Sequence, residues 1–492
     1  MKATTLKEIY KNSLFSSFLD KVSGFAEDSF IFKRRNYFKN GKYDYPEILK
    51  GSRIFYPLQK LAQRISLKEN HRIFNFLSMA LFFFIFLFTP LKSWLKGAYP
   101  MGDLYTFIVP IALVIIAVLL FSRGKDKKEW LARFTIVDLG ISFLIFSLLL
   151  SAFVSFLVYG QTKNLLYEGF IWFSYFAIFY VGRLMFNTKK ALITFLIFNL
   201  VLVFTLSLIG IGQYFFGVAT PQWIEGFETI RTRAFSTLDN PIILSGYINI
   251  FFCIALGVFV GLKKIKYRLL MLPLFSVILI SLGLTFSRGG WIGLAVGLLF
   301  FFFVYSPKYI LALIPVSIVS IIMVPQEYFY RFWAMFDSRY SDISAVSGRT
   351  WTLNNVFHIL PEHLFLGVGP GMYGGEVAFK TSPSIVYMEG IQGGAVPMQN
   401  TDNQFLQVLI QQGLVGILAF LFFVGAIFYT GVVIYQKLDD RFLKMLALGI
   451  TSSAVAFFVQ GIFADVLQFP QMSLVMFGFL GILISLPKTQ KN

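Results

Sequence analysis

Charged side chains are scarce in this chain of 492 residues: they make up 14% of the sequence, whereas hydrophobic residues make up 57%. No soluble domain has this balance, and long apolar runs recur along nearly the whole chain. The scarcity of charge therefore excludes a soluble globular protein and predicts an all-α polytopic membrane protein.

Cysteine and histidine are also scarce, with one and three residues respectively. Cys253 is the only cysteine and falls within an apolar run, so no disulfide can form within the chain and a cysteine-based metal site is excluded. His358 and His363 are candidate acid–base groups. No third ligand accompanies them, so a zinc site is not expected.

Most of the charged residues are basic, and the net charge is +18. The basic residues fall mainly in short segments between apolar runs, a bias that orients membrane proteins and favours anionic lipid. No stacking platform or basic domain accompanies them, so nucleic acid is not an expected partner. Residues 1–70 lack an early apolar core, and no signal peptide is expected. This basic, aromatic-rich extension is predicted either to lie on anionic lipid or to be a disordered tail.

The apolar runs predict about twelve transmembrane helices. They lie near 73–91, 104–122, 134–158, 165–183, 190–213, 241–261, 267–286, 289–305, 308–324, 405–435, 444–465 and 470–486. Basic residues gather in alternate connections, which are expected on the cytoplasmic side together with both termini. The predicted organisation is a cytoplasmic extension at 1–70, nine spans within 71–324, a large outer-face loop domain at 325–404 and three spans within 405–492.

Arg288 interrupts almost forty apolar residues, at the point where two predicted spans meet. A charge in that position is costly and is usually kept for function. Gly289 and Gly290 would let the backbone approach a ligand with its N–H groups open, and an arginine fork beside such amides suits a phosphate or diphosphate. The alternative is an arginine that only snorkels to the headgroups.

Further polar signals gather on the same predicted face. Arg231 and Arg233 precede the span that begins near 241, and they either bind substrate or pair with Glu225 or Glu228. Arg349, a further candidate for substrate binding, begins a predicted amphipathic helix at 349–360.

Glycines at alternate positions within 367–371 follow that helix, which Pro361 is expected to end. They predict a tight turn that brings the backbone close to another group.

Asp402 stands at the start of the tenth predicted span, where it is either a catalytic carboxylate or an N-cap. Asn403 follows it as a candidate for substrate binding. Gln404, Gln407 and Gln411 fall on one helical face behind it. Such an amide stripe suits either a hydroxyl-rich sugar or hydrogen bonds between helices.

These motifs, in this order, resemble the O-antigen ligase and O-antigen polymerase superfamily of bacterial membrane glycosyltransferases. The resembling stretches are Arg233–Pro241, Phe286–Gly293, Arg349–Gly371 and Asp402–Gly416. The resemblance implies a GT-C-like, all-helical enzyme of the bacterial inner (cytoplasmic) membrane. It also implies an undecaprenyl-diphosphate-linked glycan as donor, no metal or other cofactor, and Arg233 and Arg288 on the donor diphosphate.

One position departs from the ligase pattern. In the ligases a histidine precedes the asparagine of the last motif, whereas Asp402 stands here. This departure favours a polymerase. Asp402 is then expected to take the proton of the attacking hydroxyl while the arginines stabilise the leaving diphosphate. Direct displacement would invert the anomeric centre.

Three other functions compete with a polymerase: a ligase to another acceptor, a twelve-span transporter or flippase of lipid-linked oligosaccharide, and a non-catalytic scaffold. Transporters usually have related halves and polar groups near the membrane midplane, whereas here the polar groups cluster at one rim. The expected partners are the lipid-linked glycan and anionic membrane lipid, with a chain-length regulator as a further candidate.

Overall fold

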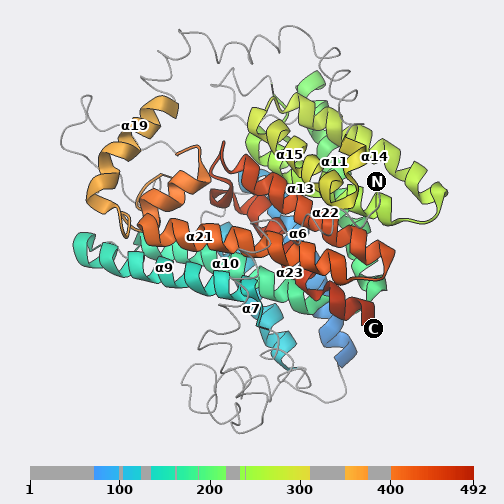
Figure 1. Cartoon of the computed structure of the whole chain (residues 1–492), viewed down its shortest axis with the longest axis horizontal. Coiled ribbons are helices and arrows are strands. Elements are labelled where there is room, and N and C mark those ends of the chain that lie inside the picture. Colours follow the sequence, from blue (N-terminus) through green and yellow to red (C-terminus); the bar gives the residue numbers. More distant parts are fainter. Residues whose placement is uncertain are drawn as a thin grey trace. The chain divides into compact units, whose positions relative to one another are not determined.

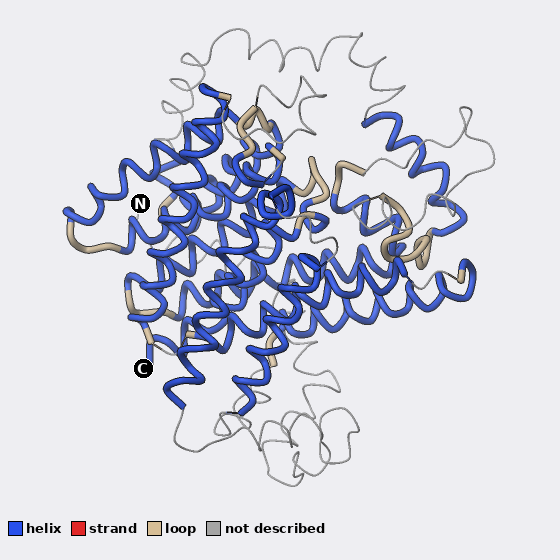
Figure 2. Tube along the Cα trace, turned by 180° about the vertical axis from the view of Figure 1, so that it is seen from behind, coloured by secondary structure: helices blue, strands red, loops and turns tan. Residues whose placement is uncertain are grey.

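The structure, a computed structural model, describes residues 71–98, 104–122, 134–160, 163–186, 188–217, 233–238, 240–310, 349–374 and 401–491. Every element in these ranges is helical (Figures 1 and 2). Ten of the helices are long and apolar enough to cross a membrane. The prediction of an all-α polytopic membrane protein is therefore confirmed.

Eleven described helices coincide with predicted spans: the ten candidate spans and α7, whose apolar part is shorter. They are α6 (His71–Ala98), α7 (Leu104–Ser122), α9 (Ile136–Tyr159), α10 (Lys163–Met185), α11 (Lys189–Phe216), α13 (Pro241–Gly261), α14 (Ile265–Leu284), α15 (Arg288–Tyr305), α21 (Gln404–Lys437), α22 (Arg441–Gln460) and α23 (Pro470–Lys491). The predicted span at 308–324 and the extension at 1–70 lie almost entirely outside the described residues, so the number of spans and the domain limits stay predictions.

Polar side chains fix one end of the bundle, where α9, α11 and α22 begin. Thr135 and Asp138 form a capping box at the start of α9, and Asp138 also binds Arg183 of α10 at 2.9 Å. Asp440 caps α22 and pairs with Lys189 of α11 at 2.6 Å. Each carboxylate thus satisfies backbone N–H groups of its own helix and joins a second helix.

Glycine allows the central helices to approach closely. In α13 and α22, 83% of each candidate span is buried. A Cβ added at Gly257 of α13 would lie 2.4 Å from the carbonyl oxygen of Met445 in α22, and one at Gly449 would lie 2.7 Å from that of Cys253. Backbones that meet at this distance leave no room for a side chain, as is usual where small residues join membrane helices.

We expect Gly257→Ala to lower the free energy of unfolding by about 1–3 kcal/mol, because the new methyl group would push the α13 and α22 backbones apart. Thermal unfolding in detergent measures the change. Gly425→Ala is the matched control, since a Cβ at that helical glycine of α21 meets nothing within 4 Å. Equal unfolding temperatures for the two variants would contradict the close contact.

Candidate functional site

The candidate site lies at the opposite end of the bundle, which we call the site end. Here α10, α13, α15, α21 and α23 begin, and α6, α11, α14 and α22 end. Hydrogen bonds join these termini: Thr237 Oγ1 donates to Pro90 O at 2.8 Å, and Gln404 N donates to Gly461 O at 2.7 Å. The four stretches that resemble the family meet at this end.

Two of the predicted arginines come together on one turn. The Ala234 amide donates to Leu284 O at 2.8 Å, and Arg233 Nε donates to Thr285 O at 2.7 Å. Arg288 is the first residue of α15, directly after that turn, and both arginine side chains are partly exposed. The N-terminus of a helix carries partial positive charge, so a cation there creates a site suited to an anion.

Both glycines after Arg288 pack closely against neighbouring side chains. The Gly290 amide donates to Ser287 Oγ at 3.3 Å, and a Cβ at Gly290 would lie 2.5 Å from Ser245 Cβ. A Cβ at Gly289 would lie 2.7 Å from Phe463 Cβ. The prediction that these two glycines keep their N–H groups open therefore fails for Gly290, because its amide belongs to the helix cap.

The second half of the site is organised by the loop 461–469, which we call the α22–α23 loop. Its Asp465 carboxylate is 2% exposed and accepts hydrogen bonds from Thr401 Oγ1 at 2.6 Å, the Asn403 amide at 2.9 Å and the Asp402 amide at 3.2 Å. The pKa of Asp465 is raised to about 6, mainly because burial disfavours the charged carboxylate; the hydrogen bonds oppose this shift and the charge of Asp402 contributes to it.

Sequence reasoning missed Asp465. The apolar run predicted a span through 465, whereas α22 ends at Gln460 and leaves this residue in the loop. A signal was present, because Asp465 is the only acidic residue after Asp440 and stands among apolar residues. A carboxylate in such surroundings is a candidate functional group by default.

Asp402 does not supply the helix cap that was its alternative role. Asn403 is the N-cap of α21, and its Oδ1 accepts from the amides of Phe405 and Leu406 at 2.9 and 3.1 Å. Asp402 is partly exposed and has a positive φ of 51°. Non-glycine residues held in that region cluster at functional sites, where the surrounding structure maintains the strain.

The glutamine stripe contacts the protein's own backbone. Gln404 Oε1 accepts from the Leu467 amide at 2.7 Å in the α22–α23 loop. The Nε2 atoms of Gln407 and Gln411 donate to Tyr373 O at 2.6 and 3.0 Å. All three side chains are buried. Binding of sugar by Gln404, Gln407 or Asn403 stays a prediction, because the hydrogen bonds described above are made within the chain.

Segment 364–371 packs against a break in α21. Gly413 has φ 66° and ψ −163° inside that helix. The freed groups are satisfied from outside, since the Val368 amide donates to Ile410 O at 2.9 Å and Leu364 O accepts from the Leu414 amide at 2.8 Å. A Cβ at Gly367 would lie 2.3 Å from the backbone of Gln411. The close backbone approach predicted for this glycine-rich turn is confirmed.

Arg349 and Arg231 are the remaining predicted arginines. Arg349 begins α19 (Arg349–Ile359), and the helix gives way to the 3-10 helix η5 (Leu360–His363), which contains Pro361. The short helix ended by proline is thus confirmed. Arg231 lies outside the described residues.

Comparison with known protein families gives a match whose residues include the centre of this site. Residues 273–421 match a family model described as O-antigen ligase. Over these residues the chain is similar to the O-antigen ligase family. The matched residues include Arg288, Asp402 and the broken part of α21, whereas Arg233 precedes and Asp465 follows them. The resemblance to the ligase and polymerase superfamily is thus confirmed, and the preference for a polymerase stays a prediction. A comparison with curated proteins found no match.

This match and the apolar helices support a multi-pass membrane protein that processes glycans. Its family acts on lipid-linked glycans.

The raised pKa of Asp465 predicts that the stability of the protein depends on pH. Between the ordinary carboxyl value of 3.8 and about 6, the folded protein holds a proton that the unfolded chain has lost. The contribution of Asp465 to the free energy of unfolding is therefore largest below that window and is lost as the pH rises through it. We expect Asp465→Asn to remove this decrease in the free energy of unfolding with rising pH. Denaturant unfolding from pH 4 to 7 measures the change.

Asp439→Asn is the control for the loss of charge, since it removes an exposed carboxylate at the other end of the bundle. Parallel pH profiles for the wild type and Asp465→Asn would contradict the raised pKa.

Proposed function

We propose that this protein polymerises a polysaccharide at the outer face of the bacterial inner membrane, by transferring a glycan from undecaprenyl diphosphate to a lipid-linked repeat unit. The supporting observation is that two cations, Arg233 and Arg288, and two carboxylates, those of Asp402 and Asp465, lie at the site end. Gly289, next to Arg288, packs on Phe463 of the α22–α23 loop, and Asp465 of that loop holds the Asp402 amide.

The proposed reaction is a direct displacement without metal or other cofactor. A hydroxyl oxygen of the acceptor sugar attacks C1 of the donor sugar, and the bond between C1 and the phosphate oxygen breaks. Asp402 takes the hydroxyl proton, and the bonding electrons leave with undecaprenyl diphosphate. Arg233 and Arg288 stabilise the charge that grows on the leaving diphosphate.

Asp465 positions Asp402 in this scheme. Its carboxylate binds the residues on either side of Asp402 and the Asp402 amide itself, and so keeps the backbone at a positive φ. Arg231, Arg349, Asn403, Gln404 and Gln407 remain proposed substrate contacts. Both termini are proposed to be cytoplasmic, which puts the site end outside.

The test is glycan transfer by the purified full chain in liposomes, supplied with an undecaprenyl-diphosphate-linked repeat unit and followed by the size of the products. The wild type should yield a ladder of multiples. Arg288→Ala should lower the rate by about 10²–10³-fold, because transition-state charge loses a donor in a water-poor site. Asp402→Asn should lower it by about 10²–10⁴-fold, because the amide cannot accept the proton.

Arg441→Ala is the matched control, since it removes an exposed arginine at the opposite end of the bundle and should retain the ladder. Transfer that persists in Asp402→Asn would remove Asp402 as the base while leaving the polymerase intact.

A ligase to another acceptor is the second candidate, because the matched family is described as O-antigen ligase. The same assay separates the two. A single addition to a different acceptor, without a ladder on the lipid-linked repeat unit, would favour the ligase and sink the polymerase.

A further inference from the structure

Two buried amide side chains join α13 to α22 at the site end. Asn249 of α13 is fully buried, and Gln460, the last residue of α22, is 1% exposed. The Nδ2 atom of Asn249 donates to Oε1 of Gln460 at 2.9 Å. Amides are costly to bury unless their hydrogen bonds are made, and the proposed reaction gives neither residue a role.

The remaining contacts of the pair fix the orientation of both amides. Asn249 Nδ2 also donates to Gly290 O at 2.9 Å. Gln460 Nε2 donates to Ile242 O at 2.9 Å and to Ser245 Oγ at 3.1 Å. A side-chain amide has two N–H donors, so both nitrogens are fully used. These contacts require an amide at each position, because a carboxylate has no N–H group to offer the two carbonyls.

Glycines on the adjoining helices enclose the pair. A Cβ added at Gly293 of α15 would lie 3.2 Å from Asn249 Nδ2 and 3.3 Å from Gln460 Cβ. A Cβ added at Gly246 of α13 would lie 3.2 Å from Gln460 Nε2. Interiors packed this closely hold side chains in one arrangement. Gly290 and Gly293 thus make room for the amide pair at the start of α15.

One side of the pair holds the turn that carries a proposed diphosphate ligand. Gly290, whose carbonyl accepts from Asn249, lies in the first turn of α15, two residues after Arg288. A hydrogen bond to this carbonyl fixes the beginning of α15 against α13. The direction in which the arginine leaves the helix therefore depends on the amide of α13.

The other side of the pair reaches the start of α21. Gly461 follows Gln460 directly, and its carbonyl accepts from the Gln404 amide at 2.7 Å. Gln404 begins α21, two residues after Asp402. Hydrogen bonds and a short piece of backbone therefore connect the Arg288 turn to the residue proposed as the base.

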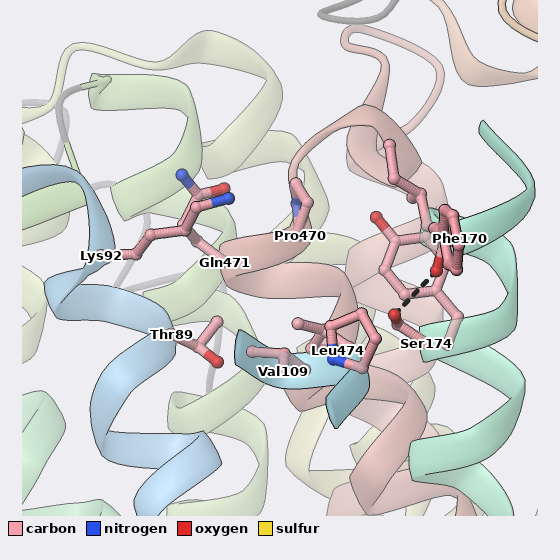
Figure 3. A pocket seen from close by; sticks show the side chains of 11 residues that line it. Thr89, Lys92, Val109, Phe170, Ser174, Pro470, Gln471 and Leu474 are labelled. Atoms are coloured by element: carbon pink, nitrogen blue, oxygen red, sulfur yellow. Dashed lines mark hydrogen bonds between the residues drawn. The ribbon is translucent and has the colours of Figure 1, made fainter. Parts of the chain in front are cut away.

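The pocket between α6, α7, α10 and α23 is small by comparison. Its cavity volume is about 40 Å³, which is room for a few water molecules. Figure 3 shows its walls, which include Val109 and Leu474, and the Ser174 hydroxyl that donates to Phe170 O of its own helix at 2.7 Å. This space is too small for a sugar or a lipid, so packing contacts set the geometry of this part of the site end.

We propose that Asn249 and Gln460 are positioning residues for glycan transfer, which fix Arg288 relative to Asp402. The inference rests on the proposed function, and it applies equally to a polymerase and to a ligase. Both reactions need the leaving diphosphate and the attacking hydroxyl at a fixed separation, and a misplacement of about 1 Å can lower a rate by about 10²-fold. A buried and fully bonded amide pair where three helices meet resists such a displacement.

The experiment is a double-mutant cycle on glycan transfer by the purified full chain in liposomes, with the undecaprenyl-diphosphate-linked repeat unit as substrate. Asn249→Ala should lower kcat about tenfold or more and change KM by less than about twofold, because misplacement weakens the transition state more than substrate binding. In an Arg288→Ala background the same substitution should add little loss, because the group that it positions is absent. The losses from independent sites would instead multiply to within about twofold.

Asn199→Ala is the matched control. Asn199 is also fully buried, and its Nδ2 donates to Phe195 O of its own helix, α11, at 2.9 Å. This variant should retain the wild-type kcat. Gln460→Glu keeps the shape of the side chain and removes N–H donors, and it provides the same cycle from α22 if Asn249→Ala does not fold. Thermal unfolding in detergent shows whether each variant is folded.

The outcomes separate this inference from the proposed function. A wild type that transfers no glycan would overturn both. Wild-type transfer with an unchanged kcat in Asn249→Ala and Gln460→Glu would overturn the positioning role alone. A loss that multiplies fully with that of Arg288→Ala would also overturn it, because the pair would then support the fold without acting through Arg288.

Discussion

The buried carboxylate of Asp465 is the interaction on which the candidate site depends. Its oxygens accept from Thr401, Asp402 and Asn403, and these bonds hold the start of α21 against the α22–α23 loop. A buried carboxylate without partners would cost several kcal/mol, so the loop and the helix start stabilise each other only when they are together. Phe463 extends the same loop to Gly289, which ties the Arg288 turn into the arrangement.

A second constraint is that backbone N–H and C=O groups need hydrogen-bond partners where water does not reach them. Gly413 breaks α21, and segment 364–371 supplies the missing partners. Non-helical backbone at such a depth is tolerated only where protein covers it. The break keeps the polar first turns of α21 apart from its long apolar remainder. Ser147 of the neighbouring α9 donates to Gln412 at 3.0 Å beside the break, where the two helices run side by side (Figure 1).

The cations and carboxylates of the candidate site, and the strained Asp402 backbone, lie at one end of an otherwise apolar bundle. The opposite end uses its ion pairs for helix capping, as Asp138 and Asp440 illustrate. At the site end the arginines stand beside a helix N-terminus, and Asp402 has a strained backbone. This asymmetry is the physical basis for assigning chemistry to one end.

The sequence by itself determined the class of the protein and the position of nearly every described helix, because a helix that crosses a membrane must be apolar along its length. It also marked Arg288 and Asp402 as candidates for function, since charges beside apolar runs are visible without a structure. Only the tertiary structure decided that Asn403 caps α21, that Arg233 reaches Thr285, and that Asp465 joins Asp402. The last two contacts link residues 52 and 63 positions apart in the chain. Local periodicity carries no information about them, because they depend on how the helices pack.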